Sequence, residues 1–277
     1  MESEKTTEHV EWERRLSVLA AQVDVWQQRA QDQPPRIAQG SSLAGDKRDM
    51  EPVNLGQLAW YSIVVSVEHL NYFVEGVRRD RSLFPSVQMT ILRTAHLSSS
   101  KAVWLLSDKS RSIRQARAAE VYGDDLREQL AMVNTTYLPD GHAEAMAEKF
   151  KKTLIERQEN LQVILDRTGS LQRAKRCRVD NTKIVNAAGK IVHSDNLDAQ
   201  GGVSLLWRTG SAAAHGNISF ANSRIKPATT YNGDDGQSYG HLFGSLEQDI
   251  GPCAAAAAMS TSAAIVLFDS RRKNYLG

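Results

Sequence analysis

Apolar side chains recur at every third or fourth position along most of this chain, and this periodicity constrains the fold more than any other feature. A clear case lies within residues 10–30, where the apolar stripe consists of Trp12, Leu16, Leu19, Val23 and Trp26. This spacing places the apolar side chains on one face of an amphipathic α-helix. Long alternating strand patterns are missing, and no repeat of fixed period is found. The sequence therefore predicts an all-α, multi-helix bundle.

The same spacing predicts further helices, with boundaries marked by Pro, Gly and capping residues. They span residues 53–77, 85 to about 106, roughly 112–132, roughly 142–166, 180 or 181 to 192 and about 246–272, and one further helix carries Arg208 and His215 after a break at Gly201-Gly202. Pro34-Pro35 and a Gly/Ser-rich loop interrupt the chain after the first helix. We therefore expect an N-terminal amphipathic helix with its linker in residues 1–50, followed by a helical domain in residues 51–277.

A long polar stretch from Asn217 to Gly244 precedes the last predicted helix. Within it, the run from Asn232 to Gly236 contains two Gly, two Asp and one Asn, which is a strong turn signal. A short hairpin around this turn is one interpretation, and a plain loop or a lid is the other. The length of the stretch makes a functional role plausible. We expect a long polar loop or small hairpin before the last helix.

Charge and composition indicate in which cellular compartment and with which classes of partner the chain functions. The 34 Lys and Arg residues nearly balance 32 Asp and Glu residues, so the net charge of the chain does not by itself indicate a nucleic-acid or membrane partner. The N-terminus lacks the order of a signal peptide, and the most apolar run, residues 254–268, is too short for a bilayer. The two cysteines, Cys177 and Cys253, fit a reduced compartment. We expect a soluble, cytoplasmic protein without a membrane partner.

Residues 207–216 contain an arginine and a histidine that lie seven positions apart in a predicted helix. Seven residues make two turns, so Arg208 and His215 return to nearly the same face, about 10 Å apart along the axis. The hydroxyl of Ser211 falls between them on that stripe. A cation that keeps its proton beside a group that titrates near neutrality suits phosphodiester chemistry. Arg208 and His215 are therefore the candidate catalytic residues.

Two short blocks of sequence resemble the HEPN superfamily of helical proteins. The first runs from residues 91–95 into residues 102–106, and the second combines residues 205–208 with residues 212–216. The HEPN signature is an arginine and a histidine with four to six residues between them, and here six residues intervene. The resemblance covers roughly Val53 to Arg272, which leaves the N-terminal helix as an addition.

The resemblance implies a metal-independent endoribonuclease of the toxin or antiviral-defence type. Many HEPN proteins act on RNA as homodimers whose paired motif helices build one cleft, and Arg208 and His215 match the hallmark residues. Thr209 and Gly210 follow the arginine where the family often places Asn, Asp or His, a departure that concerns catalysis more than fold. Other members only bind or scaffold, so the alternative is a non-catalytic, partner-binding helical protein.

Further site residues follow from their positions rather than from the signature. Ser211 and Arg93 are possible auxiliary residues, the latter because it lies in the first block. A basic segment before the motif region is a candidate RNA-contacting loop, although a soluble linker is the alternative; it comprises Arg173, Lys175, Arg176 and Arg178. Arg111, Arg114 and Arg117 form a weaker candidate, because acidic residues follow and favour a solvated face.

The motif region also has a purely structural explanation. Gly216 suits the left-handed position just past a helix end, and the helix dipole favours His215 in the last turn. Arg208 could extend beside Trp207 without a ligand. Metal-ligand spacings and phosphate-binding loops are missing from the sequence, so we expect no metal and no cofactor. In either interpretation, the apolar stripe of the first helix is a candidate binding surface for a protein partner, which for the ribonuclease is an antitoxin or a sensor.

Overall fold

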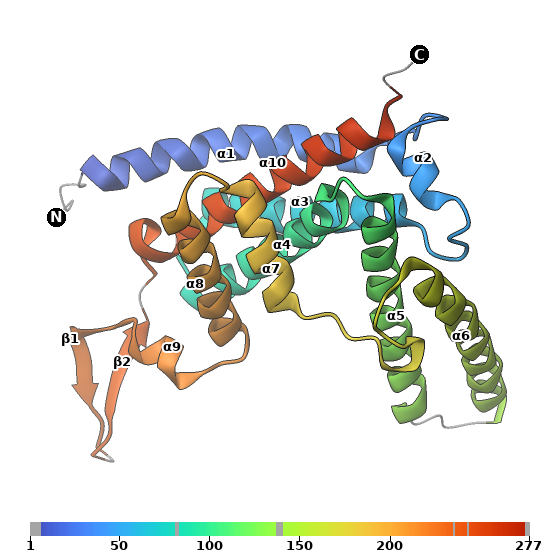
Figure 1. Cartoon of the computed structure of the whole chain (residues 1–277). Helices are drawn as coiled ribbons and strands as arrows, with labels where there is room; N and C mark the ends of the chain where they lie inside the picture. The colour runs from blue at the N-terminus through green and yellow to red at the C-terminus, as the bar shows by residue number, and fades with distance from the viewer. Residues whose placement is uncertain (1–6, 81–82, 137–140, 235, 243, 275–277) are drawn as a thin grey trace. The chain divides into compact units, whose positions relative to one another are not determined.

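The computed structural model describes residues 7–80, 83–136, 141–234, 236–242 and 244–274, and helices dominate them (Figure 1). The long helices are α1 (Thr7–Gln31), α3 (Leu55–Asp80), α4 (Pro85–Ser107), α5 (Arg111–Thr135), α6 (Gly141–Thr168), α7 (Asn181–Val192), α8 (Leu197–Ala214) and α10 (Gly251–Arg272). The short elements are α2 (Ser42–Lys47), the 3₁₀ turn η1 (Ala174–Arg176), α9 (Ile218–Asn222), the π-helical turn η2 (Leu246–Ile250) and the strands β1 (Ile225–Asn232) and β2 (Ser238–Leu242). The predicted all-α character is confirmed.

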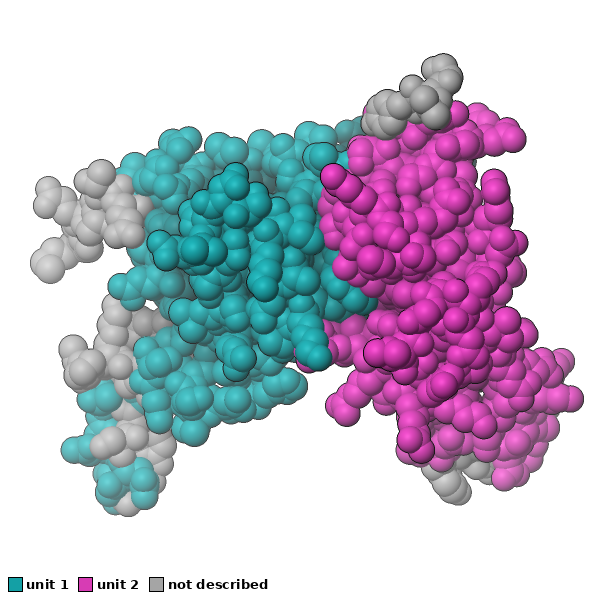
Figure 2. All heavy atoms as spheres, in the orientation of Figure 1, with its two compact units in different colours: residues 1–35, 60–104, 182–266 teal, residues 36–59, 105–181, 267–277 magenta. Residues whose placement is uncertain are grey.

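Contacts divide the chain into two compact units, which Figure 2 colours separately. Unit 1 comprises residues 1–35, 60–104 and 182–266, and unit 2 comprises residues 36–59, 105–181 and 267–277. Helices α3, α4 and α10 each run from one unit into the other. These units are clusters of contacts, and the predicted division into residues 1–50 and 51–277 stays a prediction.

Buried hydroxyl groups and apolar side chains hold the helices of unit 1 together. Ser66 Oγ of α3 donates to the carbonyl oxygen of Ala95 in α4 at 2.8 Å and lies 2.7 Å from Thr261 Oγ1 of α10. An apolar cluster joins α7, α8 and α10; its buried members are Val185, Val203, Trp207 and Ala256. The motif helix α8 is therefore fixed to the core of unit 1 by one face.

Helix α8 approaches α4 closely at Gly210. A Cβ atom at this position would lie 2.9 Å from Arg93 Cβ and 3.2 Å from the carbonyl oxygen of Met89. Because Arg93 also contacts Trp207, this approach brings the two blocks of the HEPN resemblance together. Gly210, two positions after Arg208, therefore has a packing role that the sequence alone did not reveal.

The apolar stripe of α1 faces α10 within unit 1. Val23 and Trp26 are buried, whereas Trp12, Leu16 and Leu19 are half-buried. These half-buried side chains line an apolar groove of about 320 Å³ together with small residues of α10. Part of the stripe is thus used inside the unit, and an antitoxin, sensor or other partner of this helix stays a prediction.

The last helical stretch, Leu246–Arg272, is longer than the apolar run predicted at residues 254–268. By length and composition, it is the one helix among the described residues that could cross a membrane. More than half of its most apolar window, 56%, is buried inside the structure, as in a core helix. The length argument against a membrane span therefore fails for the complete helix, and the cytoplasmic location stays a prediction.

Two long helices, α5 and α6, pack against each other in unit 2, and the turn η1 contacts both. Gly123 of α5 gives room for this packing, because a Cβ there would lie 2.7 Å from Cys177 Sγ and 2.8 Å from a methyl group of Leu161. The basic segment of the sequence therefore begins as an anchored turn, with Ala174 and Cys177 buried beneath it.

Helix α2 occupies part of the predicted Gly/Ser-rich loop, and a buried ion pair anchors it to α5. Asp46 Oδ1 lies 2.6 Å from Arg114 Nη2, and Arg114 Nε donates to Asp46 Oδ2 at 2.8 Å. The exposed fraction of the side chain is 0% for Asp46 and 3% for Arg114. The interpretation of Arg111, Arg114 and Arg117 as a solvated face is therefore wrong for Arg114.

A small hairpin stands in the polar stretch before the last helix, as one interpretation of the sequence proposed. Strands β1 and β2 pair antiparallel, with Asn232 opposite Ser238. The Gly233 N–H donates to the Gln237 carbonyl oxygen at 2.8 Å and closes the turn. Asp235 of the predicted turn lies outside the described residues. The hairpin is confirmed.

Candidate functional site

Helix α8 carries Arg208 and ends one residue before His215. Its last helical residue is Ala214, and His215 is the C-cap, with φ −95° and ψ 4°. Gly216 adopts a left-handed φ of 64°, and the N–H groups of Gly216 and Asn217 bond back to carbonyl oxygens of the last turn at 3.2 and 2.9 Å. The predicted role of Gly216 is confirmed, whereas His215 lies at the helix end rather than inside the helix.

Both candidate catalytic side chains are exposed to solvent. Within the part of the chain that the structure describes, neither Arg208 nor His215 has an ion pair or a side-chain hydrogen bond. A paired, buried arginine would be a structural element, but an unpaired one can bind an incoming anion. The two residues are therefore available to a ligand at the end of α8.

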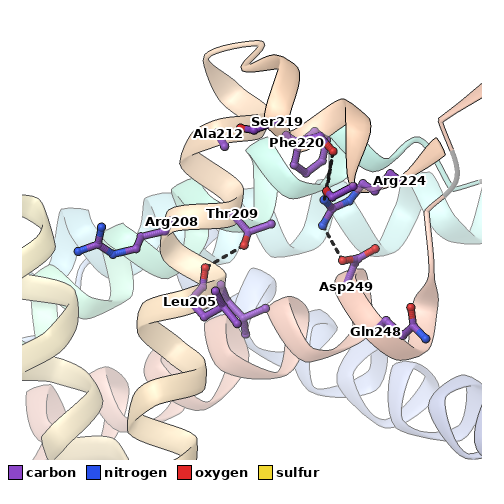
Figure 3. A pocket seen from close by; sticks show the side chains of 11 residues that line it. Leu205, Arg208, Thr209, Ala212, Ser219, Phe220, Arg224, Gln248 and Asp249 are labelled. Atoms are coloured by element: carbon purple, nitrogen blue, oxygen red, sulfur yellow. Dashed lines mark hydrogen bonds and ion pairs between the residues drawn. The ribbon is translucent and has the colours of Figure 1, made fainter. Parts of the chain in front are cut away.

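Arg208 lines a pocket of about 480 Å³ between α8, α9 and η2 (Figure 3). Its lining combines polar and apolar side chains and includes Thr209, Ser219, Phe220, Ser223, Arg224 and Asp249. Figure 3 shows the Arg208 guanidinium extending away from the pair formed by Arg224 and Asp249. His215 is not among the residues that line this pocket. Of the two motif residues, the pocket is therefore lined by Arg208 alone.

An arginine whose side chain is only 8% exposed, Arg224, forms another wall of the pocket. Arg224 Nη2 lies 2.6 Å from Asp249 Oδ1, and its guanidinium carbon lies 3.9 Å from the ring centroid of Phe220. Its Nη1 also donates to Ser223 Oγ at 2.8 Å, while Nε is buried without a hydrogen-bond partner. Because Asp249 neutralises most of this charge, Arg224 shapes the wall rather than supplying a free cation.

The two auxiliary candidates do not join Arg208 at the pocket. The guanidinium of Arg93 lies 4.3 Å from the ring centroid of Trp207, and burial lowers the pKa of this arginine. Ser211 is half-buried, and its carbonyl oxygen accepts the His215 N–H at 3.1 Å. Neither residue lines the pocket. Arg93 fixes α8 against α4, so its contact with the motif is one of positioning.

The basic segment proposed as an RNA-contacting loop belongs to unit 2, whereas the Arg208 and His215 motif belongs to unit 1. Arg173 Nη1 lies 2.8 Å from Asp166 Oδ1, in a pair of exposed side chains. The other members are exposed; these are Lys175, Arg176 and Arg178. The segment thus offers three further exposed cations, and contact with RNA stays a prediction.

His96 lies between the two parts of the first block and is buried in the core of unit 1. Burial and, to a smaller extent, repulsion from His193 lower its pKa to about 4, against the opposing effect of the Ala256 backbone. Its Nδ1 lies 3.5 Å from Ser260 Oγ, and its Nε2 has no hydrogen-bond partner. His96 is therefore a neutral core residue at neutral pH.

Metal-ligating residues do not gather at the motif. Within the ranges that the structure describes, no group of three or more His, Cys, Asp or Glu side chains could hold a metal ion. The expectation that the chain uses neither metal nor cofactor stays a prediction.

Comparison with known proteins finds no matching protein family, no similar curated protein and no similar solved structure. The HEPN resemblance therefore rests on the two blocks of sequence quoted above. Function has to be argued from the chemistry of the site, because a helical fold is compatible with many activities.

Proposed function

We propose that this chain is a HEPN-like, metal-independent endoribonuclease of the toxin or antiviral-defence type. One observation carries the proposal: α8 and its C-terminal cap expose an arginine and a histidine that have no partner among the described side chains. Arg208 offers a fork of donors for phosphate oxygens, and the imidazole of His215 offers a general base or acid. RNA cleavage needs both capacities.

The reaction requires no nucleophile from the protein. The 2′-oxygen of RNA forms a bond to its own phosphorus, the bond to the 5′-oxygen breaks, and a cyclic phosphate and a free 5′-hydroxyl result. A base removes the 2′-proton, and an acid delivers a proton to the departing oxygen. In the proposal, His215 moves protons and Arg208 stabilises the charged phosphate oxygens.

A second copy of the chain completes the proposed site. One chain offers a single motif histidine, whereas a concerted reaction uses one base and one acid. A twofold axis through the α8 surface would bring His215 of both copies to one cleft. Small side chains on this helix, Ala212 and Ala214, permit close approach; the first is half-buried and the second exposed. The proposed active species is therefore a homodimer, and RNA is its substrate.

The proposal is tested by the chemistry of the product. Purified protein in EDTA is incubated with a defined RNA oligonucleotide and with its DNA counterpart of the same sequence. The expected result is cleavage of the RNA alone, with 2′,3′-cyclic phosphate ends, and a rate that rises more steeply than linearly with protein concentration. Equal cleavage of DNA, or complete inhibition by EDTA, would contradict the proposed mechanism.

One observation favours the alternative, a non-catalytic partner-binding or scaffold protein. His215 lies at the C-terminal end of α8, where the helix dipole favours positive charge, and it does not line the pocket of Arg208. In this alternative, Arg208 and His215 are surface residues without catalytic duty. Intact RNA over a wide range of protein concentrations would favour the alternative.

A further inference from the structure

A second pocket lies wholly within unit 2, between α2, the loop after it, the start of α5 and the end of α6. Its volume is about 250 Å³, which suits a small ligand group rather than a large cofactor. The residues that carry the argument are Gly45, Arg48, Asp49, Arg111, Ser112 and Arg167. This pocket is independent of the motif in unit 1.

Positive charge dominates the lining. Three arginines face one acidic side chain, Asp49, so two positive charges are left unbalanced. Arg48 has no ion pair among the described residues, and Arg167 donates to the neutral carbonyl oxygen of Asp49. The pocket therefore has the charge that a dianion would balance.

The nearby buried aspartate does not remove this excess. Arg111 Nε lies 3.7 Å from Asp46 Oδ1, but Arg114 already binds both carboxylate oxygens of Asp46 at 2.6 and 2.8 Å. One carboxylate thus serves two arginines, and the side chain of Arg111 remains 55% exposed. The guanidinium of Arg111 lies so close over Gly45 that a Cβ there would overlap it. Arg111 is held at the pocket with its charge only partly balanced.

The first turn of α5 forms part of the same wall. Arg111 and Ser112 are its first two residues, and both line the pocket. The N-cap residue, Ser110, makes no side-chain capping hydrogen bond; its hydroxyl lies 2.9 Å from the hydroxyl of Ser112 instead. Amide groups at such a helix start carry partial positive charge and bind phosphate oxygens. They point to the same kind of ligand as the three arginines do.

We propose that this pocket binds a phosphate-monoester dianion, either free or as the head of a larger molecule. Two unbalanced charges match the charge of the dianion, and guanidinium forks match the geometry of its oxygens. Arg48 and Arg111 are the principal binding residues. Arg167 completes the wall while it holds the loop at Asp49.

The proposal is tested by calorimetric titration of the full-length chain with inorganic phosphate at mildly alkaline pH and constant ionic strength. A second arm measures binding to phosphatidylcholine vesicles with and without a monophosphorylated inositol lipid. Arg48→Gln and Arg111→Gln each remove one charge, and Lys47→Gln is the matched control. Lys47 is the last residue of α2, next to Arg48 in the chain. It is exposed and does not line the pocket. Because the side chain of Arg48 is exposed and forms no ion pair among the described residues, we expect Arg48→Gln to preserve the fold, and circular dichroism checks this.

Saturable binding of phosphate that either pocket variant weakens by roughly tenfold to a hundredfold, with no more than a small change in Lys47→Gln, supports the proposal. The same losses seen only with phosphorylated vesicles also support it and assign the phosphate to a lipid head. Two results would overturn the proposal. They are no saturable binding to either probe, and an equal loss in Lys47→Gln, which would indicate non-specific surface charge.

Discussion

The buried imidazole of His96 makes the stability of unit 1 depend on pH. In the folded chain, its pKa is lowered from 6.5 to about 4, first by burial and then by repulsion from His193. In the unfolded chain, the imidazole regains its ordinary pKa. Between these two values, the unfolded state binds a proton that the folded state rejects, so lowering the pH favours unfolding.

The size of this effect follows from the two pKa values. The full contribution of His96 is present above pH 6.5 and is lost as the pH falls toward about 4. At about 1.4 kcal/mol for each pH unit, the loss amounts to about 3 kcal/mol. This is a large share of the stability of an ordinary domain, which is about 5–15 kcal/mol.

Urea unfolding followed by tryptophan fluorescence measures this loss selectively, because all five tryptophans lie in unit 1. Carboxylates also titrate at low pH, so the wild type is compared with His96→Met, which has a side chain of similar size and no titration. We expect the free energy of unfolding of the wild type to fall by about 3 kcal/mol more than that of the variant between pH 6.5 and about 4. Equal slopes in the two proteins would refute the reasoning.

Three further predictions concern other parts of the fold. Arg114→Met removes both close guanidinium contacts of the buried Asp46 carboxylate and leaves it the looser one to Arg111 Nε at 3.7 Å, so hydrogen exchange of α5 amides should report a loss of about 3–5 kcal/mol, and a loss under about 1 kcal/mol would contradict the buried pair. Gly216→Ala forces an ordinary residue to a φ of 64° and should lower the free energy of unfolding by about 1 kcal/mol in urea; an unchanged midpoint would argue against the left-handed cap. Burial raises the pKa of Cys177 to about 11 and that of Cys253 to about 12, so a disulfide reagent at mildly alkaline pH should label them only after unfolding, and fast labelling of the folded chain would count against this.

Features that depend on local sequence could be predicted before the structure was known. The apolar stripe of residues 10–30 identified α1, and Gly216 marked the end of α8, because helix periodicity and left-handed caps are encoded within a few residues. The turn residues around Asn232 predicted the turn, with the hairpin as one of the interpretations. Local chemistry was sufficient for each of these elements.

Features that depend on contacts between residues far apart in the chain could not be predicted from the sequence. Helix α2 is six residues long, and a carboxylate on it meets Arg114, 68 positions away in the chain. From the charge pattern, this arginine was predicted to lie on a solvated face, because acidic residues follow it in the sequence. A pairing across 68 positions has no signature in a single sequence, so both the helix and the buried pair were missed.

The candidate site shows the same limit. Arg208 and His215 were identified by their spacing, and their exposure is a property that the sequence did not determine. Arg224 and Asp249, which form the far wall of the pocket, lie 25 positions apart and were not identified. No local pattern connects an arginine between α9 and β1 with an aspartate in η2. The auxiliary role of Arg93 was inferred from its block, and its contact with Trp207 is a packing contact.

The central claim is that Arg208 and His215 cut RNA without a metal ion. Cleavage of one defined RNA in EDTA is therefore compared for the wild type, Arg208→Ala, His215→Ala and Lys190→Ala, after thermal unfolding shows that all four are folded. Lys190 is an exposed cation of unit 1 outside the motif. The account predicts a loss of roughly a hundredfold or more in both motif variants and wild-type cleavage in Lys190→Ala. Intact RNA with the wild type, or equal cleavage by all four proteins, would contradict it.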